Sequence, residues 1–119
     1  MEIKNAIIKD TFLGVEDHGF FTFILHLDYG GSGQAAGLFL LDSTHEKYKL
    51  TTTGLFVTPL LREIFNISGV DCWEDLKGKH IRVKSDNEKV VSIGHVLNDK
   101  WINFREFINE YKRLESEEQ

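Results

Sequence analysis

The chain has 119 residues, a length typical of a single domain that can bury its own core. Its 41% hydrophobic and 28% charged residues are typical of a globular protein, and no run approaches the roughly 20 apolar residues of a membrane helix. The net charge of −5 argues against a broad phosphate-binding surface. The single cysteine, Cys72, excludes an internal disulfide and indicates a reducing cytoplasm. We expect one domain over residues 1–114 and an acidic, frayed tail over residues 115–119.

Apolar patterning predicts three strands before the first helix. Ile3–Val15 is rich in β-branched residues and is expected to bend near Asp10–Thr11. In Phe20–Tyr29 the odd positions form an unbroken apolar face, which a strand presents with period two. Gln34–Asp42 reads as the third strand, and Ser43–Thr53 as a loop or a short edge element.

Cap signals place the two main helices. Thr58 followed by Pro59 is typical of a helix start, although a start one turn earlier, after Gly54, is also open. Gly69 supplies the left-handed stop. The final helix is expected to follow the capping-box pattern Asn103–Glu106.

A short helical turn and a hairpin lie between these helices. The capping-box pattern Asp71–Glu74 predicts one helical turn, with Asp71 as the cap, ending at Lys77–Gly78. Lys79–Lys84 and Lys89–Leu97 then alternate as two strands around a polar tip. The order β-β-β-α-β-β-α predicts an α+β domain with an antiparallel sheet of about five strands and two main helices.

The first candidate site is the glycine-rich passage between the second and third strands. A strand pattern follows it, so it is not the dinucleotide fingerprint, which opens a helix. It is either a plain hairpin turn, a tip that contacts a partner, or a ligand-binding loop. Its candidate binding residues are Tyr29, Gly30, Gly31, Ser32, Gly33 and Gln34.

Two further groups carry candidate chemistry. His26 and Asp28 share one strand face and form either an acid/base pair or the less apolar side of a half-exposed strand. The stretch over residues 77–84 is cationic and contains no acid. It is either a ridge that contacts phosphates or an acidic partner, or an ordinary solvated face. Its candidate contact residues are Lys79, His80, Arg82 and Lys84.

Catalytic motifs are missing from the sequence. There is no Gly-x-Ser-x-Gly elbow and no His-Glu-x-x-His pair, and acidic neighbours oppose thiolate formation at Cys72. We therefore predict no catalytic residue, no metal and no cofactor, and a protein that is not an enzyme.

Three patches of the sequence carry a distinctive pattern. They are Leu-Asp-Tyr-Gly-Gly-Ser-Gly-Gln at 27–34, Trp-Glu-Asp-Leu-Lys-Gly-Lys-x-Ile-Arg-Val at 73–83, and Ile-Gly-His-x-Leu-x-x-Lys-Trp at 93–101. With this pattern the chain resembles a family of small proteins of unassigned activity in bacteriophages and prophages. The resemblance covers roughly residues 5–105 and carries no catalytic roles.

The resemblance implies a phage accessory protein that acts in the bacterial host cytoplasm. Small phage proteins of this kind often look like binders that blunt host defences, including CRISPR systems. We therefore expect a binding protein that docks on a host protein or complex, without a membrane partner. The alternatives are a small-molecule or nucleotide binder that uses the glycine loop with His26 and Asp28, and a nucleic-acid accessory protein that uses the basic strand. The sequence leaves the oligomeric state open.

Overall fold

The computed structural model describes residues 1–41 and 55–117. Within these ranges the chain forms six strands, two α-helices and one short 3-10 turn. In chain order they are β1 (Glu2–Val15), β2 (Phe21–Asp28), β3 (Gly33–Gly37), α1 (Val57–Ser68), η1 (Trp73–Leu76), β4 (His80–Ser85), β5 (Val90–Gly94), β6 (Trp101–Asn103) and α2 (Phe104–Glu117). The predicted α+β class is confirmed, and β6 adds a strand between the expected hairpin and the final helix.

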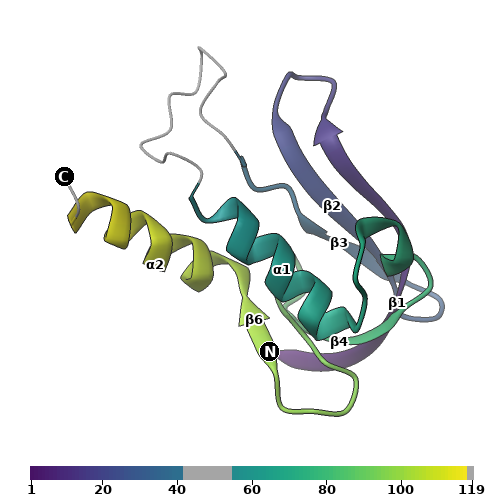
Figure 1. Ribbon diagram of the computed structural model, residues 1–119. Helices are drawn as coiled ribbons and strands as arrows, with labels where there is room; N and C mark the ends of the chain where they lie inside the picture. The colour runs from purple at the N-terminus through teal and green to yellow at the C-terminus, as the bar shows by residue number, and fades with distance from the viewer. Residues whose placement is uncertain (42–54, 118–119) are drawn as a thin grey trace.

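All neighbouring strands pair antiparallel in one sheet of order β3-β2-β1-β4-β5-β6, and the helices lie on one face of it (Figure 1). The sheet is curved, because β3 approaches β5 although three strands separate them in this order. Gln34 Nε2 donates a hydrogen bond to the Asp86 carbonyl oxygen at 3.2 Å and so links the β2–β3 hairpin to the turn of the β4–β5 hairpin. The sheet therefore curls around the helical layer.

Strand β1 joins the two halves of the sheet. Its residues Glu2–Ile7 pair with β4, and its residues from Ile7 onward pair with β2. Ile7 is paired on both sides, opposite Asp28 of β2 and His80 of β4. A bulge follows at once, because Ile8 lies opposite Leu27 whereas Asp10 lies opposite His26. The bulge lies just before the bend expected at Asp10–Thr11.

The core lies between the sheet and the helices. Alternate residues of the strands are buried there together with one side of each helix, and each fully buried Leu, Ile or Phe contributes roughly 1.5–3 kcal/mol from apolar burial. The ring of Phe23 is central, with its centroid 5.9 Å from that of Phe104 and 6.2 Å from that of Trp73. The principal buried side chains are Ile8, Phe23, Leu25, Leu27, Leu60, Ile64, Ile67, Leu76, Ile81, Val83, Ile93 and Phe104.

The helix ends differ in part from the caps that the sequence predicts. Helix α1 begins at Val57, so Thr58 lies inside its first turn and is not its N-cap; Phe56 is, without a side-chain hydrogen bond. Pro59 is tolerated because N–H groups of the first turn have no partner within a helix. The predicted stop is confirmed, since Gly69 has φ of 73° and donates its N–H to the Phe65 carbonyl oxygen.

The sequence predicts the cap of the final helix correctly and the cap of the 3-10 turn wrongly. Cys72, in an extended conformation, precedes η1 without a side-chain cap, so the predicted capping by Asp71 is wrong. At α2 the predicted cap forms, because Asn103 Oδ1 accepts the Glu106 N–H at 3.0 Å. The backbone of α2 continues to Glu117.

The predicted third strand is too long. Regular pairing ends at Gly37, which has φ of 109°, and Leu38 follows with φ of 65°. Two consecutive left-handed residues interrupt the ladder. The Leu38 N–H still donates to the Phe23 carbonyl oxygen and the Leu41 N–H to that of Phe21. The end of the predicted strand at Asp42, and the loop expected at Ser43–Thr53, lie outside the described residues.

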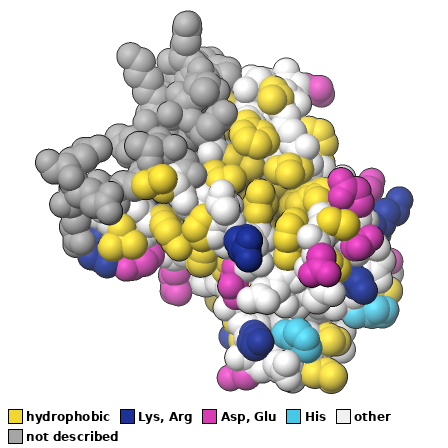
Figure 2. All heavy atoms as spheres, in the orientation of Figure 1, with side chains coloured by type: hydrophobic (Ala, Val, Ile, Leu, Met, Phe, Trp, Pro, Cys, Tyr) yellow, Lys and Arg dark blue, Asp and Glu magenta, His cyan; other side chains and the backbone are white. Residues whose placement is uncertain are grey.

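Hydrophobic side chains also gather at the surface on the helical side of the molecule (Figure 2). The helices leave part of the sheet's inner face uncovered near the β1–β2 turn, where Val15 is 67% exposed and Leu13 37% exposed. Phe21, which lies opposite Val15, is half-buried. This region is one of two apolar surfaces that a partner could contact.

Candidate functional site

The glycine-rich passage folds as a tight turn between β2 and β3. The Tyr29 N–H donates to the Ser32 carbonyl oxygen at 2.9 Å, which leaves Gly30 and Gly31 as the central residues. Their φ angles are 84° and 105°, and two positive values are what a type I′ hairpin turn requires. Gly33 is needed for space, because a Cβ there would lie 2.4 Å from the Leu27 carbonyl oxygen. The glycines therefore have a structural reason to be present.

Tyr29 and Gln34 hold the base of this hairpin. The Tyr29 hydroxyl donates to Gln34 Oε1 at 2.6 Å, and Gln34 in turn donates to the Asp86 carbonyl oxygen. Lys4 Nζ lies 4.7 Å from the centroid of the Tyr29 ring. Partial burial raises the pKa of Tyr29. These two candidate residues are thus engaged within the fold.

His26 and Asp28 lie on the opposite side of β2, away from the helices, and both are half-buried. No hydrogen bond joins them in the described part of the chain. Asp28 Oδ1 instead accepts the Gly30 N–H at 2.8 Å, a contact that supports the turn. The acid/base pair considered from the sequence is therefore not formed.

The basic strand β4 exposes the residues that its alternation predicts. Ile81 and Val83 are buried, whereas His80 is exposed and Arg82 and Lys84 are half-buried. Lys79 precedes the strand, and its carbonyl oxygen accepts the Ile8 N–H at 2.9 Å. The predicted ridge is present, with Lys79 outside the strand itself.

Arg82 is committed to the turn between β5 and β6. Its Nε donates to the His95 carbonyl oxygen at 2.8 Å and its Nη2 to that of Asn98 at 2.9 Å. Lys84 Nζ lies 4.1 Å from the centroid of the Trp101 ring, a cation–π contact. The ring in turn covers Gly94, where a Cβ would approach it to 2.5 Å. Two of the four ridge residues, Arg82 and Lys84, are therefore packed against Trp101 and its turn.

Two of the predicted groups share one surface, which we call the open face. Because Ile7 pairs with both Asp28 and His80, these two polar residues flank it, each about 5 Å away across the sheet. Exposed apolar side chains accompany them, with Ile3 60%, Ile7 38% and Phe12 36% exposed. We define the open face by these side chains of β1, β2, β4 and β6, which point away from the helices: Ile3, Asn5, Ile7, Asp10, Phe12, His26, Asp28, His80, Arg82, Lys84 and Trp101.

A shallow depression of about 240 Å³ lies on this face beside Ile7. Asn5, Asp28, Gly30 and His80 line it with Ala6, Ile7 and Tyr29. Sequence reasoning missed the contribution of β1, since both alternations of this strand contain isoleucine: Ile3 and Ile7 on one side and Ile8 on the other. This surface can be recognised only when the strands that pair with β1 are known.

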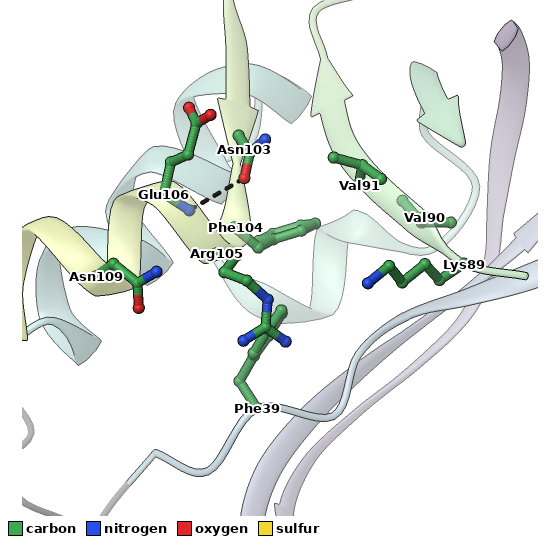
Figure 3. A pocket seen from close by; sticks show the side chains of 9 residues that line it. All are labelled: Phe39, Lys89, Val90, Val91, Asn103, Phe104, Arg105, Glu106 and Asn109. Atoms are coloured by element: carbon green, nitrogen blue, oxygen red, sulfur yellow. Dashed lines mark hydrogen bonds between the residues drawn. The ribbon is translucent and has the colours of Figure 1, made fainter. Parts of the chain in front are cut away.

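A separate cavity of about 320 Å³ lies between β5, the start of α2 and the segment after β3 (Figure 3). Its apolar wall consists of Phe39, Val90, Val91 and Phe104. Its polar lining consists of Lys89, Asn103, Arg105, Glu106 and Asn109. No sequence motif marks it, because its residues come from three distant segments.

Among the described residues, Cys72 and the potential metal ligands give no second reactive site. The side-chain hydrogen bond between Cys72 and Asp75 raises the pKa of the Cys72 thiol and so disfavours the thiolate. Within residues 1–41 and 55–117 no three His, Cys, Asp or Glu side chains are grouped so that they could hold a metal ion. None of the described helices is long and apolar enough to span a membrane.

Comparison of the chain with protein-family models, with curated proteins and with solved structures gives no match.

The turn geometry predicts the effect of substitutions at Gly30. Gly30→Val should lower the free energy of unfolding by about 1–3 kcal/mol, because its positive φ is unfavourable for a β-branched residue. Gly30→Asn should recover much of this loss, since asparagine tolerates the left-handed region. Urea unfolding of the three proteins measures the difference. Equal stability of the valine variant and the parent would contradict the turn assignment.

His95 gives a second prediction, because its Nδ1 accepts the N–H groups of Leu97 at 3.0 Å and Asn98 at 2.9 Å. His95→Asn keeps an acceptor near that position, whereas His95→Leu removes it and should cost about 1 kcal/mol. Hydrogen exchange of the Leu97 and Asn98 amides should be faster in His95→Leu than in His95→Asn. Equal exchange in both variants would show that the ring does not hold the turn.

Proposed function

We propose that this chain is a non-enzymatic binding protein that contacts another protein through the open face. The observation that carries the proposal is the exposure of Ile3, Ile7 and Phe12 on a sheet face that also carries Trp101 and several charged side chains. Exposed apolar side chains surrounded by polar ones are typical of protein interaction surfaces, and Trp and Arg are frequent among the residues that dominate binding.

The cations of this face lie at the end around Ile3, where they favour a partner with acidic groups, whereas Asp28 lies beside Ile7. His80 and Lys84 accompany Ile3 and Ile7, and Lys84 forms no ion pair with any described residue. An acidic group on the partner would meet Lys84 beside an apolar contact. The finer proposal, taken from the sequence resemblance, is that the partner is a bacterial host protein, such as a CRISPR effector, bound by a phage protein in the host cytoplasm.

The nucleic-acid alternative has less support from the same geometry. Arg82 already donates to two carbonyl oxygens, so fewer of its N–H groups remain for phosphate. Exposed Ile3 and Ile7 gain nothing from a phosphate backbone, whereas they would be buried by a protein surface.

Capture experiments with matched variants test this proposal. The tagged chain should retain a stoichiometric partner from a host lysate, and Ile3→Glu and Ile7→Glu should each weaken that complex by more than about tenfold. Val15→Glu introduces the same charge at an exposed apolar residue on the helical side of the sheet and should leave the complex intact. Ile3→Glu is the cleaner variant, because Ile3 is 60% exposed and its replacement should not impair folding, which circular dichroism checks.

The opposite pattern would contradict the proposal. If Val15→Glu releases the partner and Ile3→Glu and Ile7→Glu keep it, the binding surface lies on the helical side. If the retained material is nucleic acid and its binding weakens steeply with salt, the accessory role replaces protein binding.

A further inference from the structure

The cavity beside α2 has the dimensions and lining of a small-ligand site. Its volume of about 320 Å³ lies at the lower end of the range for ligand pockets, roughly 300–1,000 Å³. Its wall is apolar, with Phe104 almost completely buried and Phe39, Val90 and Val91 half-buried. A ligand that enters it would therefore place an apolar part against Phe104.

Two cations approach this cavity from different elements. Lys89 comes from the turn before β5 and extends toward the Arg105 guanidinium, which comes from α2 (Figure 3). The Arg105 guanidinium carbon lies 6.0 Å from the centroid of the Phe39 ring. Neither cation forms an ion pair with a described residue. Two positive charges therefore lie at one apolar cavity, and on the Lys89 side the Asp86 carboxylate accepts the Lys89 backbone N–H and interacts electrostatically with its side chain.

The polar lining limits the charge of a suitable ligand. Glu106 is also at the cavity, so the formal charge of the lining is +2 from Lys89 and Arg105 and −1 from Glu106, or +1. The positive charge comes from the two side chains, because the Glu106 N–H at the start of α2 is already capped by Asn103. One negative charge between Lys89 and Arg105 would be favourable, whereas a polyanion would also meet Glu106.

We propose that this cavity binds a small organic acid with a single carboxylate on a flat apolar body. The carboxylate lies between Lys89 and Arg105, and the body packs against Phe104 and Phe39. The asparagines at the rim, Asn103 and Asn109, offer further hydrogen-bonding groups. This site is separate from the open face, so it stands or falls independently of the proposed protein binding.

An NMR titration of the ¹⁵N-labelled chain tests the site with sodium 2-naphthoate as the probe. The backbone amides of residues 89–91 and 103–109 should shift during the titration. The uncharged 2-naphthamide should bind about tenfold more weakly, because it lacks the charge-assisted contacts. The dianionic 2-naphthyl phosphate should bind no more tightly than the naphthoate.

Matched variants locate the contacts. Lys89→Met and Arg105→Met keep long side chains without the charge, and each should weaken naphthoate binding by about fivefold to tenfold. Both residues are exposed, so the variants should fold normally, which the same spectra verify. Lys9→Met removes an exposed cation that does not line the cavity and should leave binding unchanged.

Several outcomes would overturn the proposal. They are the absence of shifts at millimolar naphthoate, equal affinity for naphthoate and naphthamide, and equal affinity in Lys89→Met, Arg105→Met and the parent. Tighter binding of the naphthyl phosphate would reject the class of monocarboxylate ligands. The ligands and variants of this titration concern the cavity alone, so these results would leave the proposed protein binding unaffected.

Discussion

The structure depends on the pairing of β1 with two different partners. Its first half lies against β4 and its second half against β2, and the two registers meet at Ile7. Without this shared strand, β2–β3 and β4–β5–β6 would be separate units of two and three strands. Each unit would expose an apolar face that its own strands cannot cover. With it, one curved sheet packs its inner face against α1 and the start of α2 and buries a continuous apolar layer.

The same constraint determines what the open face contains. Because Ile8 points toward the core opposite Leu27, Ile7 must point away from it between Asp28 and His80. The bulge after Ile8 then changes the alternation, so that Asp10 and Phe12 join the open face and Leu13 returns to the inner one. A mixed polar and apolar surface is thus a consequence of strand pairing, and its binding role is what we propose.

Much of the fold could be predicted, because local signals and tertiary packing agree. The alternation in Phe21–Asp28, the stop at Gly69 and the cap at Asn103 all act within a few residues. The wrong predictions occur where contacts between residues far apart in the sequence determine the local structure. Thr58 is not a cap because α1 already begins at Val57, and the buried ring of the N-cap residue Phe56 anchors that end of the helix in the core. The strand after the glycine turn ends at Gly37 because the chain turns left-handed twice.

The candidate site could be predicted only in part for the same reason. The sequence identified His26, Asp28, His80, Arg82 and Lys84, but their relation depends on β1, which lies between the two groups. It also identified Tyr29 and Gln34, which hydrogen-bond to each other at the base of the hairpin. All three patches that carry the sequence resemblance have structural roles here. Gly30 and Gly31 make the turn, and Gly94 and His95 position Trp101 and its turn. The patch at 73–83 supplies buried core residues, among them Leu76 and Ile81. Neither Ile7 nor Arg105 stands in a recognisable motif.

The assignment of the isoleucines of β1 to opposite faces is the central claim, and methyl NMR with a soluble gadolinium chelate tests it most directly. With the isoleucine methyl groups labelled, the account predicts strong paramagnetic broadening at Ile3 and Ile7 and weak broadening at Ile8 and Ile81, which are fully buried. Strong broadening at Ile8 together with protection of Ile7 would mean that β1 pairs in the opposite register and that the open face does not exist as described.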